Sequence, residues 1–434
     1  MRRVRAPLFF AISALCAAGV SPAAAQRAPV ATASTGPVAT AIRAQADGNL
    51  RKFYAQRGFR PLWASSGRVG PEAATLLGYL KSADLDGLDP SDYATGDLRA
   101  AIAAAKTGTP QDVARAELAL SEAFARYVRD QREPGDADMT FADKKLRPRT
   151  LSEDTVLRAA AFPKSFTAYV SGMGWMSDHY VRLRSLMKRA RATGATRDKL
   201  DRLALNLDRA RLLPGPAVRH IVVDASSGRL WYYQAGKQVG TMRVVVGAPE
   251  TQTPMLAGML QWAVLNPYWN VPDYLVRDDV APKVLAGRSL AALKMEALDG
   301  WGSNAGKIPA ASIDWKGVAA GRGIPRVREL PWTGNSMGKA KFLFPNKLGI
   351  YLHDTPKRDL LRKESRHFSN GCIRLEDAAT LGRWLLQKPL RARSNAPEQA
   401  VALPVQVPVY LTYLTATATK AGVGFRKDVY GRDG

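Results

Sequence analysis

The spacing of apolar residues changes along this chain, from helical periodicity in the first half to alternation in the second. Before Pro216, apolar positions recur every three or four residues in segments that Gly, Pro or polar residues separate. The pattern predicts a helix from Leu50 that is closed at Gly58, a second helix behind Pro71, and further helices over residues 112–130, 151–160, 178–192 and 196–212. We therefore expect the first half to be mostly α-helical.

After Pro216 the chain carries short β-rich runs at residues 220–224, 229–234, 241–246, 260–265, 348–353 and 409–415. The turns at residues 226–228 (Ser-Ser-Gly) and 235–237 (Ala-Gly-Lys) have hairpin length, which predicts a meandering antiparallel sheet. Residues 268–335 form a long insertion with weak strand signal and many glycines. We expect this insertion to be a mobile cover over a cleft and not a second core.

These patterns predict an α+β protein in which a helical N-terminal region precedes a mainly β domain with an inserted capping subdomain. The predicted boundaries are 1–25 for a signal peptide, 26–41 for a flexible leader, 42–150 for a helical scaffold domain, 151–215 for a helical connector and 216–434 for the β domain. The length and the 46% hydrophobic content allow each folded part a real core.

The first residues predict export. Arg2, Arg3 and Arg5 precede an apolar run over residues 8–20, and small residues follow at 22–26, as in a secretory signal peptide. The run is too short for a permanent span, and no later stretch approaches the roughly 20 apolar residues that a span needs. We expect a mature chain without a transmembrane segment, secreted to the periplasm. Leu15 disfavours a lipoprotein site at Cys16, because a small residue is wanted there.

The charge predicts an anionic surrounding. The formal net charge is +25, and removal of Arg2, Arg3 and Arg5 leaves about +22. A secreted chain meets an anionic cell wall or membrane surface and not nucleic acid. A basic helical stretch is either simply solvated or attracted to anionic wall polymers; it contains Arg182, Arg184, Lys188, Arg189, Arg191 and Arg197.

One cysteine stands out, because Cys16 leaves with the signal peptide and Cys372 is then alone. A lone cysteine is either a buried apolar residue or a reactive thiol. A thiol becomes a good nucleophile when an imidazole takes its proton, and His353 is the histidine that we pair with it. Gly371 allows a tight turn, so we expect the N–H groups of Gly371 and Cys372 to face a developing oxyanion.

The segment from His353 to Arg374 resembles the H-x15-[S/T]-x-G-C-x-R signature of the YkuD-type L,D-transpeptidases, with Ser369 at the expected spacing. Further segments resemble the large YcbB-like branch of that family: Thr-Pro at 253–254, Leu-Asn-Pro-Tyr-Trp-Asn-Val-Pro at 265–272, Lys-Phe-Leu-Phe-Pro-Asn at 341–346 and the end from Phe425 to Asp433. Residues 57–63 (Arg-Gly-Phe-Arg-Pro-Leu-Trp) resemble its scaffold region.

The resemblance implies a YkuD-type catalytic domain over residues 216–434 and a peptidoglycan cross-linking activity without metal or cofactor. A donor tetrapeptide stem would acylate Cys372 and lose its terminal D-alanine, His353 would be the base, and the carbonyl of Asp354 would orient the imidazole. The acyl group would pass to an amine of a neighbouring stem, giving a 3-3 or a 1-3 cross-link. The residues expected to bind substrate are Arg374, Ser369, Asn370, Tyr351, Tyr268 and Trp269.

This chain departs from the family in two ways. Asn370 stands where many members have histidine, and we take it to tune the surroundings of the thiol. Larger members also carry a separate helical peptidoglycan-binding module. In this chain only about 50 residues, near 161–210, are available for such a module, and they lack its recognisable sequence pattern.

Several alternatives stay open. His367 is a second candidate base, whereas His179 and His220 are expected to be structural, and the four scattered histidines lack zinc-ligand spacing. Tyr268 and Trp269 either line a cleft or pack in the core, and the same holds for Trp332. Water in place of an amine would make the enzyme a carboxypeptidase or hydrolase. A wall-binding module without catalysis is the alternative from another class.

Overall fold

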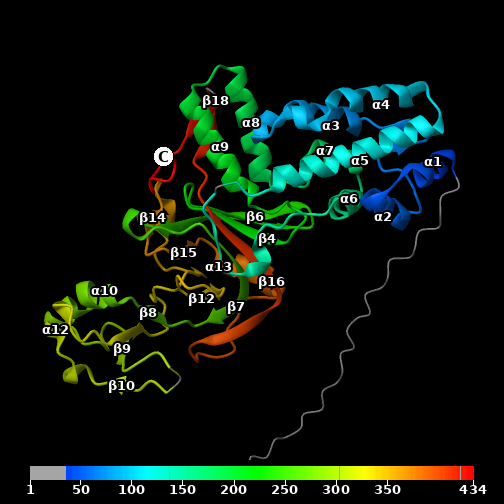
Figure 1. Ribbon diagram of the computed structural model, residues 1–434. Helices are drawn as coiled ribbons and strands as arrows, with labels where there is room; N and C mark the ends of the chain where they lie inside the picture. Colours follow the sequence, from blue (N-terminus) through cyan, green and yellow to red (C-terminus); the bar gives the residue numbers. More distant parts are fainter. Residues whose placement is uncertain (1–35, 136, 303, 421) are drawn as a thin grey trace, which may run out of the picture.

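The computed structural model describes residues 36–135, 137–302, 304–420 and 422–434, which form an elongated helical region beside a sheet domain (Figure 1). The predicted signal peptide, and the leader as far as residue 35, lie outside the described residues. Helix α1 (Pro37–Gln45) begins inside the predicted leader. Its side chains Ala39, Ala41 and Ile42 are buried. The expectation of a flexible leader is therefore wrong for residues 37–41, because their apolar face packs against the helical core.

The helical region is built around α5 (Pro110–Arg132). A capping box between Thr109 and Asp112 stabilises the N-terminus of this helix. Leu120, Phe124 and Tyr127 lie on its buried face, as the periodicity predicts. The predicted α2 stops at Gln56, since Gly58 adopts a left-handed φ of 64°. The sequence did not predict α4 or α7. The helices are α2 (Gly48–Gln56), α3 (Glu72–Lys81), α4 (Thr95–Thr107), α6 (Glu153–Ala161), α7 (Phe166–Ser171), α8 (Asp178–Ala192) and α9 (Arg197–Arg211), with short elements β1 (Ala64–Ser65), β2 (Arg68–Val69), η1 (Ala83–Asp86), η2 (Pro90–Tyr93) and η3 (Lys144–Leu146).

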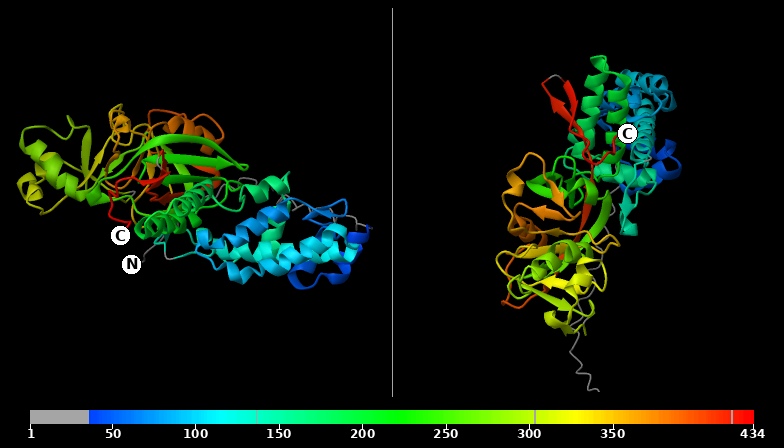
Figure 2. Two further views of the ribbon diagram at one scale, coloured as in Figure 1. Left: turned by 90° about the horizontal axis from the view of Figure 1, so that it is seen from above. Right: turned by 90° about the vertical axis from the view of Figure 1, so that its left-hand side faces the viewer.

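A buried carboxylate joins this region to α8. Both oxygens of Asp86 accept hydrogen bonds from the guanidinium of Arg184, and Tyr127 and Tyr180 donate to the same carboxylate. A buried charge with this many donors is fully paired, and removing a partner would leave it uncompensated. Helix α8 then packs beside the hairpin of β17 (Ala416–Thr419) and β18 (Gly422–Phe425), which belongs to the C-terminal part (Figure 2).

The sheet domain closes on itself. Its order is β12-β13-β15-β6-β5-β4-β16-β7-β3, with β14 on β6, and β12 also pairs with β7. The predicted hairpins are confirmed, since β4–β5 and β5–β6 are antiparallel neighbours. The strands are β3 (Thr140–Phe141), β4 (His220–Asp224), β5 (Arg229–Gln234), β6 (Lys237–Gly247), β7 (Leu256–Leu265), β12 (Ala340–Leu343), β13 (Leu352–His353), β14 (His367–Ser369), β15 (Ile373–Leu375) and β16 (Gln399–Thr412).

The expected antiparallel meander is wrong beyond these hairpins. The pairs β16–β4, β13–β15, β14–β6 and β3–β7 are parallel. Parallel neighbours need a crossover, and local turn signals do not reveal one. Three further elements lie around the sheet: η4 (Pro249–Thr251), η7 (Leu360–Arg362) and α13 (Ala378–Leu386).

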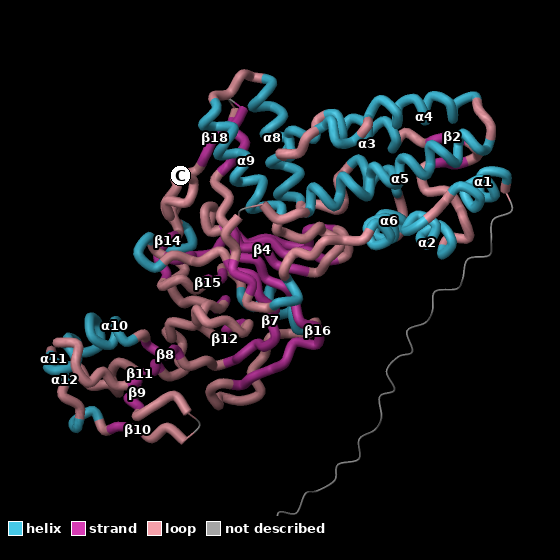
Figure 3. Tube along the Cα trace, viewed as in Figure 1, coloured by secondary structure: helices cyan, strands magenta, loops and turns pink. Residues whose placement is uncertain are grey.

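The insertion forms a small folded unit of its own, which we call the capping subdomain (residues 268–335; Figure 3). Val276, Val280, Ala297 and Val327 are buried together, away from the main core. The expectation that it holds no second core is therefore wrong, because its apolar residues are too widely spaced along the chain to show periodicity. It contains β8 (Trp269–Val271), α10 (Asp273–Leu275), the π-helical turn η5 (Val276–Val280), α11 (Ala281–Leu285), β9 (Met295–Leu298), β10 (Lys307–Ile308), η6 (Ala310–Ser312), α12 (Trp315–Ala319) and β11 (Arg326–Glu329). No helix in the described part of the chain is long and apolar enough to cross a membrane.

Candidate active site

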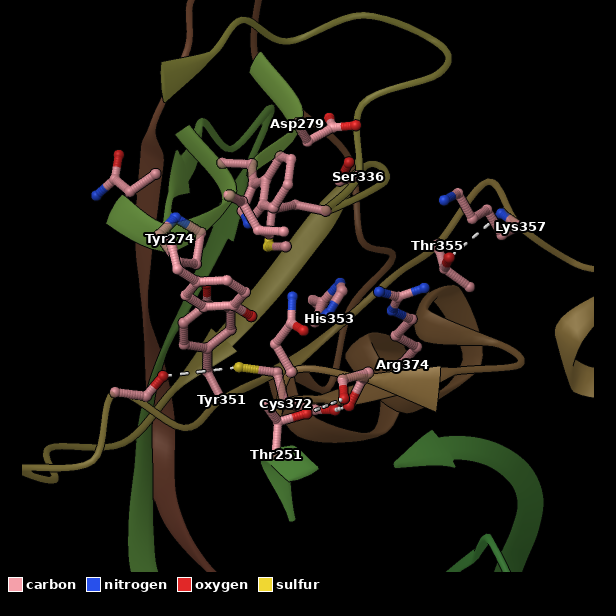
Figure 4. Close-up of a pocket in the computed structure, with 18 of the residues that line it drawn as sticks. Thr251, Tyr274, Asp279, Ser336, Tyr351, His353, Thr355, Lys357, Cys372 and Arg374 are labelled. Atoms are coloured by element: carbon pink, nitrogen blue, oxygen red, sulfur yellow. Dashed lines mark hydrogen bonds between the residues drawn. The ribbon is translucent and has the colours of Figure 1, made fainter. Parts of the chain in front are cut away.

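A cavity of about 650 Å³ lies between the sheet domain and the capping subdomain (Figure 4). The sheet side contributes Cys372, His353, Tyr351 and Arg374, which come from β13, β15 and the loops beside them. The parallel pairing of β13 with β15 places His353 opposite Arg374. Residues far apart in the sequence therefore meet at one wall because two strands are neighbours.

The thiol of Cys372 is half-buried at this wall. Its Sγ donates a hydrogen bond to the carbonyl oxygen of Gly349 at 3.6 Å. Burial raises the pKa of Cys372 to about 11, while hydrogen bonding from Tyr351 and the charge of Arg374 act in the opposite direction. The resting group is therefore a neutral thiol that needs a base.

His353 is buried beside it and has a fixed tautomer. Its Nδ1 lies 2.6 Å from the carbonyl oxygen of Asp354. A carbonyl oxygen only accepts, so Nδ1 carries the proton and Nε2 is left as a proton acceptor. Burial lowers the pKa of His353 to about 3, and the charge of Arg374 lowers it further. Within the described residues, the imidazole and the thiol form no hydrogen bond with each other in this resting arrangement.

The loop from Ser369 to Cys372 is held by hydrogen bonds from both sides. Ser369 Oγ donates to the Cys372 carbonyl at 2.6 Å and accepts from the Gly371 N–H at 3.2 Å. Thr253 Oγ1 donates to the Gly371 carbonyl at 2.7 Å. Gly371 has a φ of 103°, which disfavours any side chain there. Contrary to expectation, the Gly371 N–H is occupied by Ser369, so only the Cys372 N–H is left to face an oxyanion.

Arg374 and Asn370 lie in the cavity, as the expected substrate contacts should. Asn370 is exposed there. The Arg374 side chain forms no hydrogen bond or ion pair with any other described residue, and its buried Nε has no partner. The rest of the side chain is half-buried, so Arg374 places an unpaired positive charge at the cavity wall.

Tyr268 and Trp269, the aromatic pair at the start of the insertion, have different surroundings. Trp269 lines the cavity, whereas Tyr268 does not. The Tyr268 N–H donates to Glu398 at 2.7 Å, and the guanidinium of Arg328 lies 4.0 Å above its ring. Tyr268 therefore holds the base of the capping subdomain and, unlike Trp269, does not line the cavity where a substrate contact was expected. Trp332, which had stayed open, is 48% exposed and does not line the cavity.

The capping subdomain supplies cavity residues that the sequence did not reveal. They are Asn270, Pro272, Tyr274, Leu275, Asp279 and Lys283. Lys283 Nζ lies 2.6 Å from Asp279 Oδ2, so this wall carries both signs of charge. The sequence offered one signal for these residues, namely an acidic residue, Asp279, followed four positions later by a basic one, Lys283. This spacing is common on any solvated helix face, so it does not indicate a cavity.

The other candidate groups lie elsewhere. His367 is buried, contacts the ring of Tyr430 and does not line the cavity. His179 and His220 pack against Tyr233, and burial lowers the pKa of both. Across the described residues, no group of three or more His, Cys, Asp or Glu side chains is arranged to hold a metal ion.

A neutral thiol, an imidazole with a free Nε2 and an unpaired guanidinium in one cavity are the groups that a cysteine acyl-transfer enzyme uses. Comparison with known proteins gives the family. Residues 48–187 match the model of a scaffold domain, beyond the boundary predicted at 150, and residues 218–407 match the model of the L,D-transpeptidase catalytic domain, YkuD. This chain therefore carries a YkuD-family L,D-transpeptidase catalytic domain behind a scaffold domain.

Individual relatives agree with the family models. A candidate L,D-transpeptidase of Haemophilus influenzae is 27% identical over 396 residues, which cover 88% of this chain and 78% of that protein. Among solved structures, an L,D-transpeptidase of Mycobacterium smegmatis is 13% identical over 44% of this chain and 58% of its own, with a TM-score of 0.22. The catalytic domain of an E. faecium L,D-transpeptidase is 15% identical over 44% of this chain and 95% of its own, with a TM-score of 0.20. The likeness to the YcbB-like branch stays a prediction.

Proposed function

We propose that this protein is a peptidoglycan L,D-transpeptidase whose nucleophile is Cys372 and whose base is His353. The observation that carries the proposal is the presence of a neutral thiol and a proton-accepting imidazole at one wall of a cavity in a YkuD domain. The groups expected of such an enzyme lie together at this wall.

The first half of the reaction forms a thioester. The thiol turns from the Gly349 carbonyl towards His353, and Nε2 takes its proton as Sγ attacks the carbonyl of the donor stem. Resting hydrogen bonds at active sites often tighten only when substrate is bound. The bond to the terminal D-alanine then breaks, and the imidazolium returns the proton to the departing amine. The Cys372 N–H faces the oxyanion of the tetrahedral intermediate.

The second half regenerates the thiol. An amine of a neighbouring stem attacks the thioester, a new amide bond forms, and Sγ leaves and recovers a proton through His353. Water at this step would give the carboxypeptidase or hydrolase instead. The capping subdomain favours the amine, because it covers the cavity and limits the access of water.

Arg374 would bind a carboxylate of the stem peptide, since its guanidinium has no partner in the described structure and lies in the cavity. A planar guanidinium suits a carboxylate through paired hydrogen bonds. Ser369, Asn370, Tyr351 and Trp269 would shape the space around the acyl group. From this substrate and the predicted signal peptide, we also infer that the protein acts in the periplasm at the cell wall.

Muropeptide analysis tests this function. Purified protein is incubated with tetrapeptide-bearing muropeptides, and the products are separated and sequenced by mass spectrometry. We expect cross-linked dimers with wild-type protein and none with Cys372→Ala. The fragment masses distinguish a 3-3 from a 1-3 bond. Monomers trimmed by one D-alanine, without dimers, would instead support the hydrolase.

A further inference from the structure

The basic stretch on α8 divides into two sets of arginines with different surroundings. Arg184 and Arg191 are bound to Asp86 and Asp84. Arg182 and Arg189 are exposed, and their side chains form no hydrogen bond or ion pair with any residue that the structure describes. The first set holds the fold together. The second set is free to bind something else.

These two free arginines border a second cavity, of about 400 Å³. Helix α8, which carries them, lies at the opposite end of the sheet domain from the capping subdomain (Figure 1). The lining residues of this cavity come from α8, β5 and the β17–β18 hairpin. Helix α8 packs against both strands of that hairpin (Figures 1 and 2). Arg426 on the loop after β18 contributes a third cation, and Trp231, His179 and Asp224 also line the space.

The charge of this groove is positive. Arg426 donates one hydrogen bond to the Leu414 carbonyl at 3.0 Å and forms no ion pair within the described chain. Asp224 is the one acidic lining residue; it is buried and accepts from the backbone N–H groups of Ser226 and Leu414. Burial raises the pKa of Asp224, while the nearby charge of Arg426 and the hydrogen bonds to the carboxylate act in the opposite direction. Even when it is ionised, this one carboxylate leaves an excess of positive charge beside the three arginines.

An apolar surface lies among these cations. Trp231 is half-buried, with its ring centroid 4.7 Å from that of His179 at 75°. Leu414 and Ala416 continue the surface. An aromatic face suits the C–H face of a sugar ring, while guanidinium groups suit carboxylates. Together they fit an acidic saccharide better than a bare anion, which would leave the apolar surface unused.

We propose that the groove formed by Arg182, Arg189, Arg426 and Trp231 binds a saccharide chain that carries carboxylates, and so holds substrate polymer on the enzyme away from the catalytic cavity. The choice of ligand rests on the proposed function, since stem peptides on a glycan strand supply both the sugar ring and the carboxylates. The groove would thereby bind the substrate polymer, as a separate binding module does in larger members of the family.

Binding to full-length Cys372→Ala protein tests the site without turnover. The probe is a soluble, uncross-linked glycan chain bearing tetrapeptides, titrated by calorimetry. Arg182→Gln/Arg189→Gln removes two lining charges. Lys188→Gln/Arg197→Gln removes two exposed charges from α8 and α9 outside the groove and is the matched control. We expect Kd to rise about tenfold or more in the first variant and less than about twofold in the control. Trp231→Leu should also weaken binding.

Three results would overturn the proposal: equal losses in the two double variants, which would indicate net charge alone; equal binding of a neutral chitooligosaccharide; or binding of a phosphate polymer as tight as that of the glycan–peptide chain. Acylation of the otherwise wild-type double variant by a small β-lactam donor separates this site from the catalytic one. It should be unchanged. Groove binding without any acylation of Cys372 would leave the saccharide site standing and remove the proposed activity.

Discussion

The two walls of the active-site cavity are built in opposite ways. The sheet wall holds Cys372, His353 and Ser369 through strand pairing and buried hydrogen bonds. The capping wall presents half-exposed side chains such as Tyr274, Asp279 and Lys283 on a subdomain with its own small core. The difference indicates that the chemistry is fixed by the main fold, while the capping wall adjusts which partner reaches the thioester.

The largest expected effect falls on the sheet wall. His353→Ala should slow acylation of Cys372 by roughly 10²-fold to 10⁴-fold, as loss of a general base does. His367→Ala is the matched control and should stay near the wild-type rate, because His367 does not line the cavity. Stopped-flow measurement with a chromogenic β-lactam gives both rates. The reverse order of the two variants would assign the base to His367.

Removal of the capping wall should change how the thioester is resolved, by water or by an amine, and should leave the acylation of Cys372 intact. Val271 and Val327 are antiparallel register partners, so an Asn-Gly turn can join them and replace residues 272–326. Cys372 should still be acylated, while the ratio of hydrolysed tetrapeptide to cross-linked dimer rises at least about threefold as water gains access. An unchanged ratio, measured by chromatography of the products, would show that the subdomain serves another purpose.

A smaller change on the same wall tests its charges. Asp279→Asn/Lys283→Gln removes the ion pair that faces the cavity, and we expect KM for the acceptor stem to change by about twofold to tenfold with little change in acylation. Arg277→Gln/Asp278→Asn removes a neighbouring exposed pair that does not line the cavity. Similar kinetics of the two variants would mean that the charges of Asp279 and Lys283 do not contribute to binding of the acceptor stem.

The smallest expected effect is the pH dependence of acylation. The pKa of His353 is lowered to about 3 and that of Cys372 is raised to about 11, so base and thiol are both neutral between these values. The acylation rate should change less than about threefold from pH 5 to pH 8. A steep fall below pH 6.5 would indicate an imidazole of ordinary pKa and contradict a buried neutral base.

The same burial has a consequence for stability. The unfolded chain binds a proton at His353 below about pH 6.5, whereas the folded chain does not until about pH 3. The free energy of unfolding should therefore fall as the pH drops through this window, and His353→Asn should lessen the fall by roughly 1 kcal/mol or more. Urea titrations at pH 6.5 and pH 4 measure the difference.

The sequence revealed what local patterns encode. The period of apolar residues located α5, α8 and α9, and the hairpin turns located β4 to β6. The spacing from His353 to Cys372 singled out the residues that share the cavity. The parallel pairings, the core of the capping subdomain and the contacts of Tyr268 depend on residues distant in the chain, which periodicity does not connect. The occupied Gly371 N–H depends on where Ser369 Oγ points, which the motif alone does not specify.

If Cys372 is the nucleophile, it forms a thioester with the donor stem. Intact-protein mass spectrometry after brief incubation with a tetrapeptide donor, quenched in acid, detects this intermediate. We expect one adduct per chain with the mass of the donor less one D-alanine, mapped by proteolysis to Cys372, and no adduct in Cys372→Ser. An adduct at another residue, or free D-alanine released in full by Cys372→Ser, would contradict it.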